Sequence, residues 1–128
     1  MGQIYQHYKN EQLYDLCLEA EHPETSQQFV VYLGLYTSEK FPNNRWARPI
    51  SMFFENVTHE GNRVPRFTKL EGIVIDTLLP DFGHIFHRGE MCPIVLNNVL
   101  HSETLEPHIV YQSGSSGKYY FEETNNFL

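Results

Sequence analysis

Residues 22–32 read HPETSQQFVVY, and residues 101–111 read HSETLEPHIVY. In both phrases a polar segment precedes β-branched and aromatic residues, which favour a pleated strand. The polar His-x-Glu-Thr part contains residue types that fit tight turns. We therefore predict a β-hairpin at each phrase. We expect Glu24 and Thr25 to satisfy backbone N–H groups of the first turn while His22 covers the hairpin.

The similarity extends beyond these two phrases. Residues 9–32 align without a gap on residues 88–111 with six identities in 24 positions, where roughly one or two are expected by chance. The identical pairs are Glu11/Glu90, His22/His101, Glu24/Glu103, Thr25/Thr104, Val31/Val110 and Tyr32/Tyr111. Upstream, residues 4–7 resemble residues 85–87, and downstream residues 46–53 align loosely on residues 120–127. We interpret the pattern as a tandem duplication with a truncated second copy; the alternative is two unrelated hairpins with similar turns.

Short strands separated by turns predict an all-β, mainly antiparallel fold. Turn signals recur at intervals of about 8 to 12 residues, which is typical of a small barrel. One short helix is expected after Pro49, because proline fits the beginning of a helix. A further hairpin is expected around Glu60-Gly61-Asn62. The predicted organisation is a first module at 1–70, a connecting segment at 71–82, and a partial second module at 83–128. Each copy alone would have a marginal core, so we expect the second to pack on the first.

Charge excludes one class of partner. The net charge is −7, and it divides into about −1 through Leu70 (seven basic against eight acidic residues) and −6 from Glu71 onward (two against eight). Binding to duplex nucleic acid needs a field of uncompensated Lys and Arg, which this chain lacks. No apolar run reaches the roughly 18 to 20 residues of a membrane span, and the N-terminus lacks a signal-peptide pattern. We therefore predict a cytoplasmic protein without membrane partners, in which Cys17 and Cys92 are reduced core thiols.

The order of motifs in the first half resembles a small bacterial domain, domain-of-unknown-function family 1653. The blocks that carry the resemblance, over about residues 4–68, are Tyr5-x-His7-Tyr8-Lys9, His22-x-Glu24-Thr25, Val30-Val31-Tyr32-x-x-Leu35-Tyr36, Trp46-x-Arg48-Pro49-x-x-Met52-Phe53 and Gly61-x-x-Val64-Pro65-Arg66-Phe67. The resemblance implies an SH3-like barrel, so we expect tandem SH3-like barrels with the second copy truncated. It assigns no activity. The appended partial copy departs from the family pattern and leaves a homodimer open.

The first copy contains a set of residues suited to a ligand that combines an anion with a ring. Arg48 is held on a stiff backbone by Pro49, and nearby donors could join it around a carboxylate or phosphate, while aromatic faces could hold a planar group. The predicted ligand-binding residues are Tyr5, His7, Lys9, Tyr36, Trp46, Arg48 and Arg66. The alternative is that the aromatic residues fill the core and Arg48 pairs with Glu24 or Glu55.

The two copies differ at the position of Arg48. The loose alignment places Glu122 there, and almost no basic residue follows Arg88. We therefore expect the first copy to hold any ligand and the second to serve as scaffold or lid.

Catalysis and metal binding are weakly supported by the sequence. His22 and Glu24 would share one face of a strand, but a His-x-Glu pair without cysteine pairs is weak evidence, so we predict no metal site and no cofactor. Cys17 lies among leucines, where a thiol is unreactive. The predicted function is a non-enzymatic binding module for a small anionic or nucleotide-like ligand. The alternatives are a protein or peptide interaction module and a small hydrolase that uses His7 and Glu24.

Overall fold

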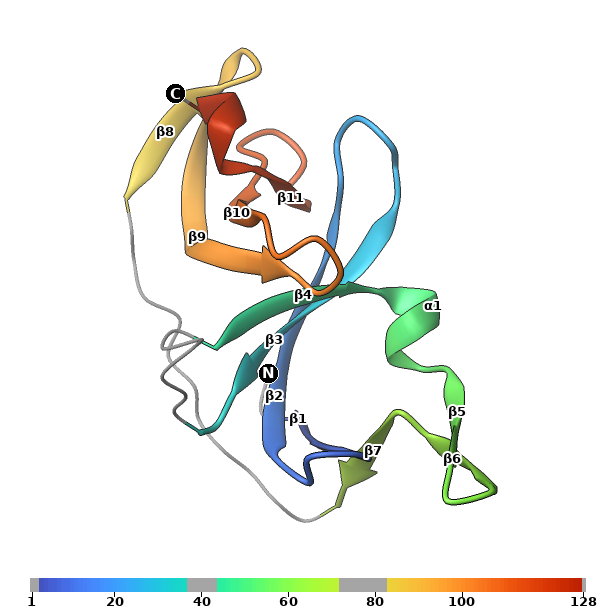
Figure 1. Ribbon diagram of the computed structural model, residues 1–128. Coiled ribbons are helices and arrows are strands. Elements are labelled where there is room, and N and C mark those ends of the chain that lie inside the picture. The colour runs from blue at the N-terminus through green and yellow to red at the C-terminus, as the bar shows by residue number, and fades with distance from the viewer. Residues whose placement is uncertain (1–2, 37–43, 72–82, 128) are drawn as a thin grey trace.

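The computed structural model describes residues 3–36, 44–71 and 83–127 (Figure 1). The prediction of a mainly antiparallel all-β fold with one short helix is confirmed. In chain order the elements are β1 (Gln3–His7), β2 (Leu13–Glu21), β3 (Gln28–Gly34), β4 (Arg45–Pro49), α1 (Ile50–Phe53), β5 (Asn56–His59), β6 (Asn62–Pro65), β7 (Phe67–Leu70), β8 (His84–His87), β9 (Glu90–His101), β10 (Pro107–Gln112), β11 (Tyr119–Glu123) and a 3₁₀-helix (Thr124–Phe127). The predicted connecting segment lies outside the described residues from residue 72 to residue 82.

Nine strands form one large sheet. Its order is β11-β10-β9-β4-β3-β2-β1-β7, with β8 paired to β9. Most neighbours are antiparallel, whereas β4 pairs with β9 and β11 pairs with β2 in the parallel sense. Strands β2, β3, β4, β9, β10 and β11 pair in succession, and the pairing of β11 with β2 connects the two ends of this series. The two halves of the chain therefore share one sheet, and the division into two SH3-like barrels stays a prediction.

Two local predictions are confirmed. The helix α1 begins directly after Pro49, and its Phe53 side chain is fully buried. Strands β5 and β6 form a separate hairpin whose turn is Glu60-Gly61. Both turn residues have a positive φ, 52° and 80°. A two-residue hairpin turn favours this conformation, because its twist then matches that of the two strands.

Strand β3 lies between two clusters of buried side chains. Successive side chains of a strand point to opposite faces, so Phe29 and Val31 enter one cluster while Val30 and Tyr32 enter the other. The first cluster, here the shared core, draws on both halves of the chain and contains Ala20, Phe29, Val31, Ala47, Leu96, Val99, Val110 and Phe121. The second, here the aromatic cluster, contains Tyr5, Tyr14, Val30, Tyr32, Phe53 and Phe67.

The turn between β2 and β3 shows what the His-x-Glu-Thr phrase does. The Oγ1 of Thr25 accepts a hydrogen bond from the N–H of Gln27 at 3.2 Å, which confirms its predicted role. The predicted role of Glu24 is wrong, because its own N–H donates to Nδ1 of His22 at 3.2 Å and its carboxylate pairs with Arg88 at 3.6 Å. The histidine is therefore the acceptor that holds the turn.

The same six-residue turn recurs at residues 7–12, 101–106 and 113–118. In each, the first residue donates its N–H to the carbonyl of the sixth and accepts a bond from the N–H of the fifth. The fifth residue has a positive φ in all four turns, at Glu11, Ser26, Leu105 and Gly117. Residues 7–12 read HYKNEQ and residues 113–118 read SGSSGK, so the turn does not require the His-x-Glu-Thr letters. The repeated phrase therefore reports a turn geometry and does not by itself establish a duplication.

The two hairpins that carry the phrases reach across to the opposite half. In Figure 1 the turn of the β2–β3 hairpin extends toward β11, and the turn of the β9–β10 hairpin lies beside β4. Trp46 of β4 is opposite Leu100 of β9, and Tyr120 of β11 is opposite Glu21 of β2. This crossing brings the β9–β10 turn next to the residues predicted to bind a ligand.

Candidate functional site

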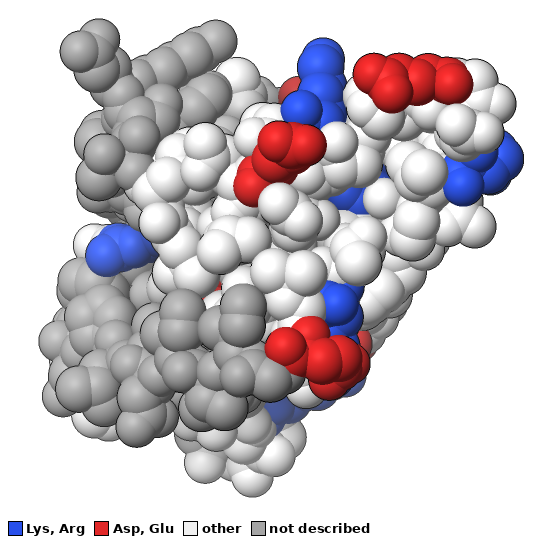
Figure 2. All heavy atoms as spheres, turned by 90° about the horizontal axis from the view of Figure 1, so that it is seen from below, with Lys and Arg blue, Asp and Glu red and all other residues white. Residues whose placement is uncertain are grey.

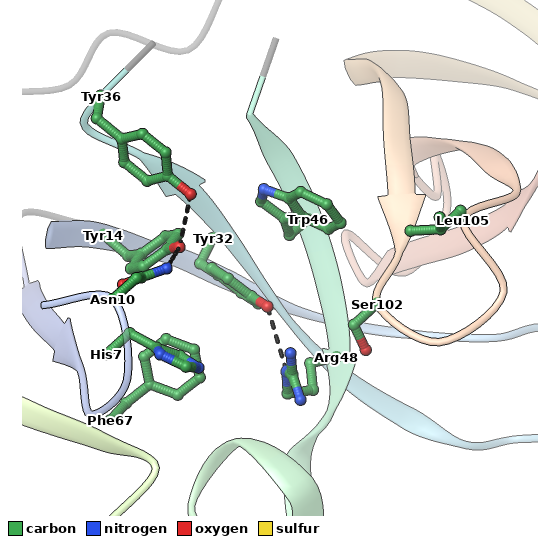
Figure 3. A pocket seen from close by; sticks show the side chains of 10 residues that line it. All are labelled: His7, Asn10, Tyr14, Tyr32, Tyr36, Trp46, Arg48, Phe67, Ser102 and Leu105. Atoms are coloured by element: carbon green, nitrogen blue, oxygen red, sulfur yellow. Dashed lines mark hydrogen bonds between the residues drawn. The ribbon is translucent and has the colours of Figure 1, made fainter. Parts of the chain in front are cut away.

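A pocket of about 310 Å³ opens where the first half meets the β9–β10 turn (Figure 3). Its walls come from β1, β2, β3, β4 and β7 of the first half and from the turn of the second half. The lining residues are His7, Asn10, Tyr14, Tyr32, Tyr36, Trp46, Arg48, Phe67, Ser102 and Leu105. None of them is acidic, and most carry an aromatic ring or a hydrogen-bond donor.

Arg48 is the cation of the pocket. It lies on β4 opposite Val30, on the face of the sheet that carries the aromatic cluster. Its Nε donates to the hydroxyl oxygen of Tyr32 at 3.2 Å, and its guanidinium carbon lies 5.9 Å from the ring centre of Phe67. Stacking and one hydrogen bond hold the group while its terminal N–H groups remain available to a ligand.

The alternative pairing of Arg48 is wrong. Glu55 forms its ion pair with Arg66, and Glu24 forms its pair with Arg88. Within the ranges 3–36, 44–71 and 83–127, no carboxylate pairs with Arg48. A partly buried guanidinium beside neutral rings favours an anion from outside the chain, because a cation removed from water is stabilised by an opposite charge.

His7 is a neutral donor in the pocket. Burial, together with the positive charges of Arg48, Arg66 and Lys9, lowers the pKa of His7 to about 4. Its Nδ1 accepts the N–H of Lys9 at 3.1 Å, so the ring proton of the neutral form resides on Nε2. The turn at residues 7–12 thus fixes the tautomer, and Figure 3 shows the imidazole beside Phe67 at one side of the pocket.

Hydroxyl groups supply further donors. The hydroxyls of Tyr14 and Tyr36 are 2.8 Å apart, and Asn10 donates to Tyr14 at 3.2 Å (Figure 3). Burial first, and then the contact with Tyr14, raises the pKa of Tyr36, so this phenol stays neutral. Because Tyr32 accepts from Arg48, its own proton remains available. The Oγ of Ser102 is buried and has no hydrogen-bond partner among the described residues.

Four of the seven predicted site residues line this pocket: His7, Tyr36, Trp46 and Arg48. The structure brings these four side chains together from two strands, β1 and β4, and from the segment after β3. Whether they bind a ligand stays a prediction.

The other three predicted residues lie elsewhere. Tyr5 is in the aromatic cluster, edge-on to Phe53 with ring centres 5.3 Å apart. Lys9 is exposed on the turn after β1. Arg66 donates to the carbonyl of Met52 at 3.1 Å and pairs with Glu55, so it fastens β7 and its neighbours to α1. The positive charges of Lys9 and Arg66 still act on the pocket, because both help to lower the pKa of His7.

The sequence prediction missed six lining residues: Asn10, Tyr14, Tyr32, Phe67, Ser102 and Leu105. Tyr32 lies in the phrase that predicts the first hairpin, and its place beside Arg48 follows from the pairing of β3 with β4. That pairing was a usable signal, because residues opposite one another share a face. Ser102 and Leu105 carry no such signal, since they enter the pocket from the other half.

The enzyme alternatives find little geometric support. Burial raises the pKa of the Cys17 thiol to about 12, and both cysteines are buried and free, as predicted. His7 lies in the pocket, whereas Glu24 pairs with Arg88, and the described residues show no contact between the two. Among those same residues, no group of three or more histidine, cysteine or acidic side chains is placed to hold a metal ion.

Charges of both signs are interspersed on the face drawn in Figure 2. The Lys and Arg side chains coloured there lie mostly beside Asp and Glu, without a continuous basic field. The structure contains, in its described part, no helix long and apolar enough to cross a membrane.

Comparison with known proteins gives one result. The model of a family described as "Protein of unknown function (DUF1653)" matches residues 3–69, just over half of the chain. No curated protein sequence and no solved structure matches the chain significantly. The matched segment contains eight of the ten residues that line the pocket and ends before Ser102 and Leu105.

Proposed function

The chain belongs to the DUF1653 family, and from this premise we propose that it is a non-enzymatic binding protein whose pocket takes a small anionic ligand. The observation that carries the proposal is Arg48, a guanidinium held in place by Tyr32 and Phe67 at a pocket with no acidic residue among its described lining. Charge-assisted hydrogen bonds to such a group are about twice as strong as neutral ones.

The remaining lining residues suit the rest of such a ligand. Aromatic faces from Tyr14, Tyr36, Trp46 and Phe67 surround the pocket and can hold a planar group. The neutral His7 ring and the hydroxyls of Tyr32 and Ser102 can donate hydrogen bonds without adding charge. The described residues that line the pocket include a histidine but no acidic partner for it, which supports binding over hydrolysis.

A thermal-shift screen tests this function. Small carboxylates, phosphates and nucleotides are added singly to the full chain and to Arg48→Ala, and the melting temperature is measured. At least one anion should raise the melting temperature of the wild type, and Arg48→Ala should remove that increase. Arg63→Ala is the matched control, because Arg63 is exposed on the β5–β6 hairpin, away from the pocket. Stabilisation by no anion would contradict the proposal.

We propose in addition that the two halves are a tandem repeat of one SH3-like unit. The two runs β1-β2-β3-β4 and β8-β9-β10-β11 have the same order of hairpins, and each ends in a short helical turn. Their registers also correspond: Val30 is opposite Arg48 in the first half, and Ile109 is opposite Glu122 in the second. These positions coincide in the sequence alignment of the two copies.

A second candidate is interaction with a protein partner, and one observation favours it. Phe86 and Met91 lie opposite one another on the β8–β9 hairpin and are 68% and 54% exposed. An exposed apolar pair on an edge strand is a place where another chain can dock. If Phe86→Ser abolished self-association or partner binding that Arg48→Ala left intact, this reading would be preferred.

A further inference from the structure

We infer that the anionic group bound by the pocket is a carboxylate, and that the ligand is a small aromatic acid. The inference rests on the proposed function of the pocket and adds the chemical class of its ligand. Its basis is a comparison inside the molecule, because the second half holds a carboxylate of its own at the corresponding position.

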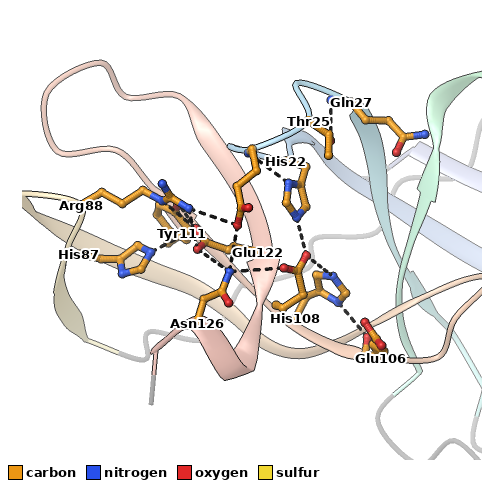
Figure 4. A network of polar contacts seen from close by, with 12 residues as sticks. His22, Thr25, Gln27, His87, Arg88, Glu106, His108, Tyr111, Glu122 and Asn126 are labelled. Atoms are coloured by element: carbon orange, nitrogen blue, oxygen red, sulfur yellow. Dashed lines mark hydrogen bonds and ion pairs between the residues drawn. The ribbon is translucent and has the colours of Figure 1, made fainter.

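That carboxylate belongs to Glu122, which is 1% exposed (Figure 4). Its Oε1 accepts hydrogen bonds from the hydroxyl of Tyr111 at 2.8 Å and from the His87 ring at 3.1 Å. Arg88 donates to both oxygens, from Nε at 3.1 Å and from Nη2 at 2.9 Å. A tyrosine, a histidine and an arginine thus form a complete carboxylate site, with Asn126 as a further donor at 3.0 Å.

The same three residue types meet in the first half. Tyr32 corresponds to Tyr111 in the sequence alignment, and each lies on the third strand of its half. His7 is the last residue of β1, as His87 is the last residue of β8. Tyr32 and His7 line the pocket of Arg48, and Tyr111 and His87 line a second pocket of about 410 Å³.

The surroundings of the two pockets also correspond. Trp46 of the first pocket matches Tyr120 of the second, and both are opposite the matched tyrosine of the neighbouring strand. Ser102 lines the first pocket from the turn of the other half, and Pro23, its counterpart in the alignment, lines the second. The two pockets therefore share these matched positions, and each hairpin turn contributes to the pocket of the other half.

Their charges differ: Glu21 and Glu90 line the second pocket, whereas none of the described residues that line the first is acidic. The difference that bears on the ligand is at one strand position. Glu122 occupies the strand position where the first half has Arg48. In the second half the strand supplies the carboxylate and Arg88 on the β8–β9 turn supplies the guanidinium. In the first half the strand supplies the guanidinium and no described residue pairs a carboxylate with it, so we assign that carboxylate to a ligand. The donors of Tyr32 and His7 correspond to those that Tyr111 and His87 direct at Glu122.

Charge balance favours a carboxylate over a phosphate. Among the described residues that line the pocket, Arg48 carries the positive charge and His7 is neutral at pH 7, while Lys9 and Arg66 act on His7 from outside the lining. One positive charge matches a carboxylate monoanion, whereas a phosphate monoester carries about −1.5 to −2 at this pH. The pocket volume is at the small end of the roughly 300–1,000 Å³ of ligand sites, so a single ring with a carboxylate fits better than a nucleotide.

The test uses the ¹⁵N-labelled full chain and three probes that share one ring: benzoate, benzamide and phenyl phosphate. Each is titrated while the backbone amide signals are followed. Benzoate should shift the signals of residues around the pocket in a saturable way. Benzamide should bind at least about tenfold more weakly, because it loses the charge-assisted hydrogen bond. Phenyl phosphate should also bind at least about tenfold more weakly, because its larger negative charge is not balanced at the pocket. Arg48→Gln and Tyr32→Phe should weaken benzoate binding by a similar factor, and the exposed Arg63→Gln should leave it unchanged.

The possible results distinguish the carboxylate inference from the small-anion function on which it rests. Tighter binding of phenyl phosphate than of benzoate would overturn the carboxylate inference and retain the small-anion function. Equal binding of benzoate and benzamide would overturn it as well, because the charge would then contribute nothing. Binding of none of the probes, with no stabilising anion in the thermal screen, would overturn both. The comparison of probes uses the wild type alone, so it stands even where a variant fails to fold.

Discussion

The Nε–H of Arg48 donates to the hydroxyl oxygen of Tyr32 across 3.2 Å. This bond joins the neighbouring strands β4 and β3. It fixes the plane of the guanidinium and therefore the directions of its remaining N–H groups. The same bond occupies one lone pair of Tyr32, so the phenolic proton is left to donate into the pocket. Arginine and tyrosine thus prepare each other as donors before a ligand arrives.

Replacement of Arg48 by lysine should therefore impair binding although the charge is kept. Lysine has no planar fork and no Nε–H group in the position that reaches Tyr32. We expect benzoate affinity to fall about tenfold, while the free energy of unfolding changes by less than about 1 kcal/mol. Titration calorimetry and urea unfolding measure the two quantities. Wild-type affinity in Arg48→Lys would show that the pocket senses only charge.

The pH dependence of stability should report the buried state of His7. The folded-state pKa of about 4 lies below the usual 6.5, so between these values the unfolded chain binds more protons than the folded chain. The contribution of His7 is therefore complete above about pH 6.5 and is lost as the pH falls toward 4. Urea unfolding at pH 5 and pH 7 should show a smaller pH effect in His7→Gln than in the wild type.

A matched control is available for that measurement. His84 is exposed on β8, and His84→Gln should leave the pH effect of the wild type in place. An identical pH dependence in the wild type and His7→Gln would contradict the assignment of a buried neutral imidazole.

Much of the fold was accessible from local sequence, and the site was accessible only in part. The phrase FVVY predicted a strand correctly, because β-branched and aromatic residues favour that geometry wherever it is placed. The burial of Val30 and Val31 on opposite faces could not be predicted, since it depends on the second half covering the first. For the same reason Arg48 and Trp46 were identified by residue type, whereas Ser102 was missed: its contact with the pocket is a product of the β4–β9 pairing.

The network around Glu122 should bind an added carboxylate once its own is removed. Burial alone would raise the pKa of Glu122, but hydrogen bonds from Arg88, Asn126, Tyr111 and His87 outweigh burial and lower it to about 2. Glu122→Ala should therefore cost about 3 kcal/mol of stability, the usual penalty for breaking a buried pair. Acetate at pH 7 should restore part of this loss, since a ligand that binds the folded state stabilises it. Melting temperatures in sodium acetate and sodium chloride measure the effect.

Glu103 provides the comparison for that experiment. It is an exposed residue of the β9–β10 turn, and Glu103→Ala should respond equally to acetate and chloride. If acetate failed to stabilise Glu122→Ala beyond chloride, the arginine, tyrosine and histidine would not by themselves form a carboxylate site. The argument that transfers this chemistry to the first pocket would then be lost.

The fifth position of the six-residue turn should accept glycine with a gain in stability. Ser26 has a φ of 61°, a conformation that costs a residue with a side chain about 1 kcal/mol. We expect Ser26→Gly to raise the free energy of unfolding by about 0.5 kcal/mol, because glycine loses part of the gain to its greater freedom when unfolded. The reciprocal change, Gly117→Ala at a φ of 74°, should lower it by about 1 kcal/mol. If both changes raised the free energy of unfolding, or both lowered it, the two turns would not share one geometry.

A fragment that ends at Leu70 should not be a stable monomer. It retains four members of the shared core, Ala20, Phe29, Val31 and Ala47, and it loses Leu96, Val99, Val110 and Phe121, which cover them. Four exposed core residues and an unpaired edge on β4 favour association.

If the halves are repeats, two fragments can pair β4 of each with β2 of the other, as β4 pairs with β9 and β11 with β2 in the full chain. Light scattering should then show a dimer, and its urea midpoint should rise with protein concentration. A monomer as stable as the full chain would mean that the first half completes its core without the second. The first half would then fold without the turn that brings Ser102 to the pocket.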